Sequence, residues 1–156
     1  MIVTSEAFTP NGNIPVKYTC DGEDINPPLD IDNIPDQTKS IVLIVDDPDA
    51  PAGVWDHWVV WNISPKGRIE EDSIPGVEGL NDFGKHHYGG PCPPSGVHRY
   101  FFKVYALNKQ LDLDPKSRSS KVKAAMRDHI LAEGELIGLY EREPWAIQSH
   151  RHDKEY

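Results

Sequence analysis

The sequence has few cysteines, no long apolar run and little basic charge. Its two cysteines, Cys20 and Cys92, are too few and too far apart for a CxxC redox pair or a metal cluster. No apolar run reaches the roughly 18 to 20 residues of a membrane span, and the N-terminus lacks the basic and apolar pattern of a targeting segment. We therefore predict a cytoplasmic protein without a transmembrane segment. Since disulfides are rare in the cytosol, both cysteines are predicted to be free thiols.

Basic residues are scarce relative to acidic ones. The chain has 16 lysines and arginines against 25 aspartates and glutamates, which gives a formal net charge of -9. Such a chain is not expected to bind nucleic acid or an anionic membrane through long-range attraction. A single pocket can still differ in sign from the surface as a whole, so the composition allows a local anion site.

Proline and glycine are abundant instead, and they indicate the fold class. The 14 prolines and 12 glycines separate short apolar runs, a distribution typical of many short strands joined by turns. The chain is long enough for one domain, which we predict to span residues 1–156, and too short for two ordinary ones. We predict an all-β sandwich with a small α component. Its predicted strands are Ile14–Tyr18, Ser40–Asp46, His57–Ile63, Arg99–Leu107 and Glu135–Tyr140.

One segment near the C-terminus has helical periodicity. Side chains that can form one apolar stripe recur three and four residues apart at Val122, Ala125, Met126, His129 and Ile130. We predict a helix that begins near Asp114 or Ser117, packs this stripe on the sandwich and ends by Gly134.

Two stretches lack periodicity altogether. Residues 64–96 are rich in proline and glycine, and we predict that they form an ordered loop with a functional role. The charged tail at residues 150–156 is predicted to be frayed.

Carboxylates and an imidazole are predicted to meet where two strands share one end. Asp47 and Asp49 follow the apolar run of residues 41–45, at a point where prolines end the ladder pairing. His57 begins the next strand after a short turn. Polar groups held on a rigid rim of this kind are what a ligand site requires.

A second polar group lies at the start of the strongest predicted strand. Alternation places His98 and Tyr100 on one face of that strand and Arg99 on the other. If this strand end lies beside the first two, two imidazoles, a phenol and carboxylates converge on one small cavity. Imidazolium and phenol groups donate hydrogen bonds, as do loop amides, so the cavity suits phosphate or a similar oxyanion. The predicted ligand-binding residues are Asp47, Asp49, His57, His98, Tyr100, Trp55, Gly90 and Pro93.

The carboxylates are predicted to support this site rather than to touch an anion. Asp47 is expected to hold an imidazole in one tautomer and to raise its pKa. Asp49 is expected to cap loop amides or to face the ammonium group of a ligand, and Arg99 to be an ion-pair partner. Protonated imidazoles should bind the anion better, so we expect binding to weaken as the pH rises through roughly 6 to 7.

Other chemistries use the same residue types. The histidines and aspartates could ligate zinc, but no HxH or HExxH spacing supports a metal site. Ser95 lacks a GxSxG elbow and Cys92 has no obvious base beside it, so neither is indicated as a nucleophile. A small hydrolase using Asp47, His57 and His98 in acid/base catalysis stays open, as does a purely structural cluster. We predict a non-enzymatic binding module with no metal and no cofactor.

Several strings of the sequence resemble the phosphatidylethanolamine-binding protein family, also called the Raf kinase inhibitor-like proteins. The strings that carry the resemblance are DPDAP at residues 47–51, HWVVWN at 57–62 and GVHRY at 96–100. The flanking strings KYTCDG at 17–22, YGGPCPP at 88–94 and LAEGELIG at 131–138 look like the short bacterial and archaeal branch of the family. The resemblance covers nearly the whole chain.

The resemblance implies a fold, a ligand and partners. The fold would be a Greek-key sandwich of two antiparallel sheets with a helix near the C-terminus and an anion pocket at one end. Motif matching assigns Asp47, Asp49, His57, His98 and Tyr100 to that pocket. The implied ligand is a phosphoethanolamine-like head group, and the implied partner is a kinase or a protease that the chain would regulate or inhibit. The family also implies a homodimer and a cis peptide bond at Ala50-Pro51.

Overall fold

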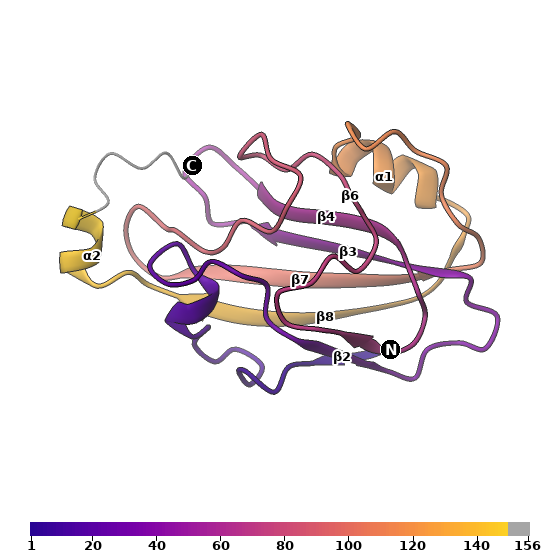
Figure 1. The fold of residues 1–156 in the computed structure, drawn as a ribbon, viewed down its shortest axis with the longest axis horizontal. Helices are drawn as coiled ribbons and strands as arrows, with labels where there is room; N and C mark the ends of the chain where they lie inside the picture. Colours follow the sequence, from indigo (N-terminus) through magenta and orange to yellow (C-terminus); the bar gives the residue numbers. More distant parts are fainter. Residues whose placement is uncertain (150–156) are drawn as a thin grey trace.

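Two antiparallel β-sheets make up most of the structure, a computed structural model that describes residues 1–149 (Figure 1). The strands are β1 (Ile2–Thr4), β2 (Leu29–Asp32), β3 (Ser40–Asp47), β4 (Trp55–Ile63), β5 (Arg68–Ile69), β6 (Val77–Glu78), β7 (His98–Leu107) and β8 (Ile130–Tyr140). The helices are the 3₁₀ helix η1 (Val16–Tyr18), α1 (Ser119–Met126) and α2 (Pro144–Ser149). One sheet has the order β1-β2-β5 and the other the order β6-β4-β3-β7-β8. The predicted fold class, mostly β with a small α component, is confirmed.

The five-stranded sheet has a Greek-key order. β3 and β4 form a hairpin, β6 pairs with β4, and β7 returns to the other side of β3. The order β7-β3-β4-β6 is that of a Greek key, with β5 contributed to the smaller sheet on the way. Because β3 has a neighbour on each side and both of its faces are covered, all eight of its residues are buried.

The main core lies between the two sheets. Leu43 of β3, Val60 of β4 and Phe102 of β7 point into it and are fully buried. Leu29 and Ile31 of β2 pack in the same core from the smaller sheet. Burial of side chains of this size stabilises the fold by about 1.5 to 3 kcal/mol each. This packing fixes β3, β4 and β7 relative to one another.

Helix α1 covers the opposite face of the five-stranded sheet. Val122 and Met126, two members of the predicted apolar stripe, are buried with Val42, Ile44 and Trp61. In Figure 1, α1 lies over β4 at the right-hand end of the sheet, whereas α2 lies at the left-hand end. The left-hand end of the sandwich is otherwise formed by loops.

The helical stripe ends earlier than its spacing predicted. The helix ends at Met126, and Asp128 has a left-handed φ of 69° that stops it. Ile130 then begins β8 and lies opposite Leu107 of β7. The assignment of His129 and Ile130 to the helix was wrong. Their spacing suits one more helical turn, but Ile130 pairs with β7 instead.

The strand predictions are correct with one exception. The predicted strands Ser40–Asp46, His57–Ile63, Arg99–Leu107 and Glu135–Tyr140 fall within β3, β4, β7 and β8. The predicted strand Ile14–Tyr18 is wrong, since its second half is the 3₁₀ helix η1. Pro15, at the start of η1, has no N–H for a ladder, and the isolated parallel bridge to Leu139 is made by Asn13, just before the predicted strand. The prediction for the tail lies outside the described residues.

The two cysteines are bonded to each other, so the prediction of free thiols is wrong. Cys20 and Cys92 form a disulfide with their Cα atoms 5.4 Å apart, although they are 72 residues apart in sequence. The N–H of Cys20 also donates to the carbonyl oxygen of Pro91 at 3.1 Å. No local spacing indicates such a bond, because the fold alone brings the two segments together.

The predicted cis bond at Ala50-Pro51 is also wrong, since no peptide bond in the described part of the chain is cis. The β3–β4 loop turns at Gly53, which has a φ of 110° and whose N–H donates to the carbonyl oxygen of Ala50 at 3.1 Å. Glycine adopts a positive φ at little cost, so this loop reverses direction with trans peptides throughout.

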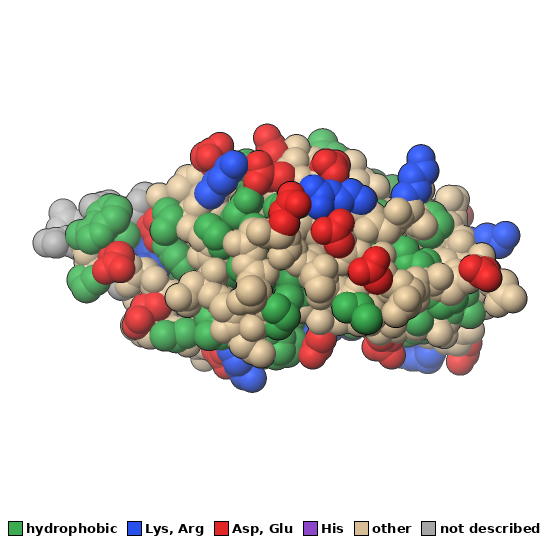
Figure 2. Space-filling model, turned by 90° about the horizontal axis from the view of Figure 1, so that it is seen from below, with side chains coloured by type: hydrophobic (Ala, Val, Ile, Leu, Met, Phe, Trp, Pro, Cys, Tyr) green, Lys and Arg blue, Asp and Glu red, His purple; other side chains and the backbone are tan. Residues whose placement is uncertain are grey.

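Charged side chains of both signs are scattered over the surface. On the face shown in Figure 2, acidic and basic groups lie next to one another rather than in separate large patches. Arg68, for example, forms ion pairs with Glu6 and Asp30. Within residues 1–149, no helix has the length and the apolar character needed to cross a membrane.

Candidate functional site

Three strand ends meet at the left-hand end of the sandwich in Figure 1. β3 ends at Asp47, which lies opposite Trp55, the first residue of β4. β7 begins at His98 and pairs with the other side of β3. The two polar segments therefore share one end of the sheet, as the sequence predicted.

Asp47 is fully buried and accepts a hydrogen bond on each carboxylate oxygen. Oδ2 lies 2.6 Å from Nδ1 of His98, and Oδ1 accepts the backbone N–H of Asp49 at 2.8 Å. Because a carboxylate only accepts, Nδ1 of His98 carries a proton. Asp47 thus orients the His98 ring and fixes its tautomer, which is the supporting role predicted for it.

Asp49 turns away from His98 and pairs with Arg99. Its Oδ1 lies 2.8 Å from Nη2 of Arg99, and its Oδ2 accepts both Nε and the backbone N–H of Arg99, each at 2.9 Å. Hydrogen bonds from the guanidinium of Arg99 lower the pKa of Asp49 to about 2. Asp49 therefore holds a strand amide, that of Arg99 at the start of β7, rather than the predicted loop amide, and Arg99 is its ion-pair partner.

His57 is fully buried and is held by the loop before β7. Its Nδ1 lies 2.7 Å from the carbonyl oxygen of Gly89, and the Gly89 N–H donates to the carbonyl oxygen of His57 at 3.1 Å. Since a carbonyl only accepts, Nδ1 of His57 is protonated and the neutral ring has its lone pair on Nε2. Burial lowers the pKa of His57 to about 4. Because burial disfavours the charge, the unliganded ring is neutral near pH 7, and the predicted weakening of anion binding between pH 6 and 7 stays a prediction.

Tyr100 packs between the two histidines. Its ring centroid is 5.3 Å from that of His57 with the planes at 87°, and 6.5 Å from that of His98 with the planes at 23°. The Tyr100 side chain is fully buried, and His98 is 6% exposed. Asp47, His57, His98 and Tyr100 are called the buried cluster below.

Trp55 and Phe83 form an aromatic wall beside His57. The Phe83 ring centroid is 5.1 Å from that of His57 and 5.5 Å from that of Trp55, with planes at 76° and 72°. Edge-to-face contacts of this kind favour defined ring orientations. Trp55 is among the ligand-binding residues predicted from the sequence and Phe83 is not, because no periodicity in residues 64–96 indicates which side chains point inward.

Gly90 and Pro93 lie in the loop that carries Gly89. The N–H of Gly90 donates to Oδ1 of Asp24 at 2.7 Å, and a side chain at this position would collide with Asp24. Pro93 is buried directly after the disulfide residue Cys92. Both residues thus help to fix the loop that holds His57.

The side chains of the buried cluster offer hydrogen-bond donors and acceptors. Within residues 1–149, no three histidine, cysteine, aspartate or glutamate side chains are grouped so that they could hold a metal ion. Two imidazoles and a phenol lie together, and the adjacent carboxylate of Asp47 already accepts on both oxygens. Such a group can donate to an oxyanion if the imidazoles carry the necessary protons.

Comparison with protein families identifies the fold. A family model described as phosphatidylethanolamine-binding protein matches residues 4–141, which include the whole buried cluster. The chain belongs to the phosphatidylethanolamine-binding protein family. The resemblance predicted from the DPDAP and GVHRY strings is confirmed.

Members of this family from archaea and bacteria are similar over most of the chain. A UPF0098 protein of Methanothermobacter thermautotrophicus is 51% identical over 150 residues, which cover 91% of this chain and 99% of the relative. The crystal structure of a phosphatidylethanolamine-binding protein homolog from Chlamydia trachomatis is 42% identical with a TM-score of 0.88, covering 91% of this chain and 97% of that one. YbcL of Escherichia coli is 31% identical with a TM-score of 0.83, covering 90% and 98%.

Proposed function

We propose that the protein binds a small phosphate-bearing anion at the buried cluster, with phosphoethanolamine as the type of head group. The observation that carries this proposal is the packing of His57, His98 and Tyr100 around a carboxylate whose two oxygens are already occupied. Asp47 therefore supports His98, and the rings carry the side-chain N–H and O–H groups that we propose donate to an anion. The family is named for binding a lipid with such a head group.

Anion binding at this site is proposed to be coupled to proton uptake. Neutral His57 uses its one N–H on Gly89, so the ring donates from Nε2 only after it gains a second proton. A bound anion favours that charged form and raises the pKa of His57 from about 4. Binding should therefore be stronger at acidic pH and weaken as the pH rises.

The proposed activity is binding without turnover. Cys92, one of the two nucleophiles considered from the sequence, is bonded to Cys20 and has no thiol to offer. Ser95 lies exposed in the loop before β7. Regulation of a kinase or a protease, a homodimer and a cytoplasmic location stay predictions from the sequence.

Calorimetric titration with inorganic phosphate and with phosphoethanolamine tests the proposal. The Tyr100→Phe variant removes one donor from the cluster and keeps the ring, so we expect binding to weaken roughly 10- to 100-fold. The His129→Gln variant is the control, because His129 contacts Asn108, far along β7 from the buried cluster. Absence of heat with both anions at millimolar concentration, or equal binding by Tyr100→Phe, would refute the proposal. Release of inorganic phosphate from phosphoethanolamine would instead show an enzyme.

A further inference from the structure

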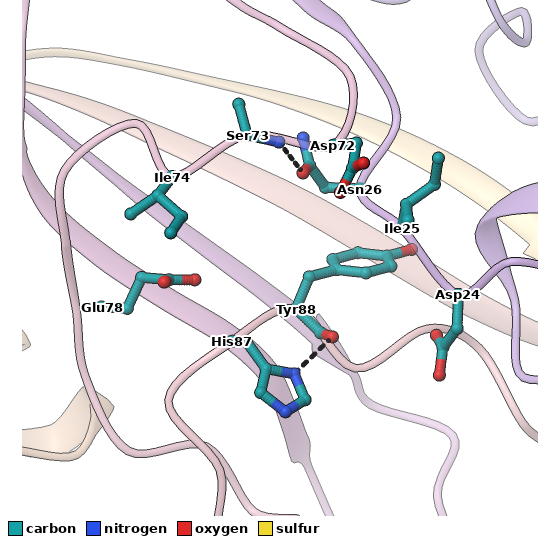
Figure 3. Close-up of a pocket in the computed structure, with 9 residues that line it drawn as sticks. All are labelled: Asp24, Ile25, Asn26, Asp72, Ser73, Ile74, Glu78, His87 and Tyr88. Atoms are coloured by element: carbon teal, nitrogen blue, oxygen red, sulfur yellow. Dashed lines mark hydrogen bonds between the residues drawn. The ribbon is translucent and has the colours of Figure 1, made fainter.

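An acidic cavity lies outside the buried cluster. It has a volume of about 540 Å³ and is bounded by residues 24–26, residues 72–74, β6 and residues 87–88 (Figure 3). None of the four residues of the buried cluster lines it. The DPDAP and GVHRY strings contribute no residue to the lining of this cavity.

The walls of the cavity are joined by a buried asparagine. Asn26 is 3% exposed, its side-chain nitrogen donates to the carbonyl oxygen of Glu70 at 2.9 Å, and its Oδ1 accepts the N–H of Ser73 at 2.9 Å. The N–H of Asp72 also donates to the carbonyl oxygen of Asn26 at 3.1 Å. These bonds connect residues 24–26 to residues 72–74, so the cavity is preformed.

Carboxylates outnumber basic side chains around the cavity, where His87 is the one basic residue among the described lining residues. Asp24, Asp72 and Glu78 line it, and no lysine or arginine is among the described residues around it. None of these three carboxylates takes part in the ion pairs formed within residues 1–149. By contrast, nearby Glu71 is paired with Lys17. Acidic groups in a concave surface concentrate the local field and attract a cation.

Glu78 is held in position for a ligand. Its Oε2 accepts the indole N–H of Trp58 at 2.8 Å, and Trp58 is 1% exposed. Figure 3 shows the Glu78 carboxylate directed into the cavity, toward the side where Tyr88 lies. The Tyr88 ring is itself fixed, because its hydroxyl donates to the carbonyl oxygen of Tyr18 at 2.8 Å. A carboxylate fixed in this way loses little freedom when it binds a cation.

Apolar groups line the same cavity and narrow the choice of cation. Ile74 is 77% exposed, and Ile25 and the ring of Tyr88 also contribute to the lining. No three acidic or histidine side chains in the described chain are grouped closely enough to ligate a metal. An organic cation with an alkyl chain satisfies both the carboxylates and the apolar surface.

We propose that this acidic cavity binds an alkylammonium group, with the ammonium against Glu78 and the alkyl chain against Ile74 and Tyr88. The group can come from a free amine or from a lysine side chain of a partner protein. The proposal stands independently of anion binding at the buried cluster, because it uses other residues.

Titration with spermidine and with a short, capped lysine-containing peptide tests this site, by following backbone amide NMR shifts of residues 72–78 and 87–88. The Glu78→Gln variant removes the charge and keeps an oxygen acceptor for Trp58, and we expect about tenfold weaker binding. Asp36→Asn is the matched control, because Asp36 is exposed, lies outside the cavity and carries the same charge.

Each outcome of this titration decides the proposal. Binding of spermidine that is weakened by Glu78→Gln and not by Asp36→Asn supports a free amine as the source. Binding of the peptide alone, with the same pattern, supports a lysine side chain of a partner. No saturable shift with either probe, or equal weakening in both variants, overturns the proposal. Phosphate titration of Glu78→Gln should match the unmodified protein, which separates this test from that of the buried cluster.

Discussion

The buried cluster and the acidic cavity both contain carboxylates, but the two regions use them differently. In the buried cluster, Asp47 accepts hydrogen bonds on both oxygens from groups of the protein itself. In the acidic cavity, Asp24, Asp72 and Glu78 have no ion-pair partner within residues 1–149. The functional group is a carboxylate in both regions, but its burial and its partners differ, since Asp47 is fully buried while Asp24 and Asp72 are exposed.

This difference underlies the ligand that we propose for each region. Asp47 orients His98 through its carboxylate, and the rings of His57, His98 and Tyr100 are the groups that we propose bind an anion. A carboxylate without a cationic partner leaves a field that solvent or a bound cation must compensate. One acidic chain is therefore expected to bind an anion at one place and a cation at another.

The largest expected effect comes from removing the carboxylate of the buried cluster. Asp47→Ala should lower the free energy of unfolding by about 3 to 5 kcal/mol, because it breaks a buried pair with His98 and frees the loop amide of Asp49. Denaturant unfolding measures this value. Asp72→Asn in the acidic cavity is the comparison variant and should change stability by less than about 0.5 kcal/mol. Equal losses in the two variants would show that the two regions use their carboxylates alike.

A smaller effect is expected from the disulfide, which joins a segment of the acidic cavity to a segment of the buried cluster. Along the sequence, Cys20 comes shortly before Asp24 of the acidic cavity, and Cys92 comes shortly after Gly89, whose carbonyl oxygen holds His57. Replacing both cysteines with serine should lower the free energy of unfolding by about 2 to 4 kcal/mol, because the unfolded chain loses a long closed loop. Unfolding of the unmodified protein with and without a dithiol reductant checks this. Identical midpoints under the two conditions would contradict it.

Much of the fold follows from local pattern. The apolar runs of β3, β4 and β7 are continuous because these strands lie between covering layers, and runs of this kind are visible in the sequence. The errors occurred where distant pairing decides the local structure. Pro15 blocked a ladder that the apolar spacing favoured, and Ile130 joined β7 although its spacing suited the helix. The bond between Cys20 and Cys92 depends on a contact between segments with no shared pattern.

The buried cluster was predictable because strand ends and side-chain alternation place its members. Asp47 ends one strand, and His98 and Tyr100 alternate at the start of another, so one face could be assigned to them. The environment of His57 was not predictable, since its burial and its bond to Gly89 depend on an irregular loop. The acidic cavity could not be predicted from the sequence, because Asp24, Asp72 and Glu78 come from three separate segments.

Phosphate affinity measured against pH tests the central claim most directly, namely that rings rather than carboxylates bind the anion. The experiment compares the unmodified protein with His57→Gln between pH 5 and pH 7, so that ionisation of phosphate cancels in the ratio of their affinities. The pKa of His57 is about 4, and a bound anion must raise it. The ratio of unmodified to variant affinity should therefore fall as the pH rises, by up to tenfold per unit for uptake of one proton. A ratio that stays constant over this range would contradict the account.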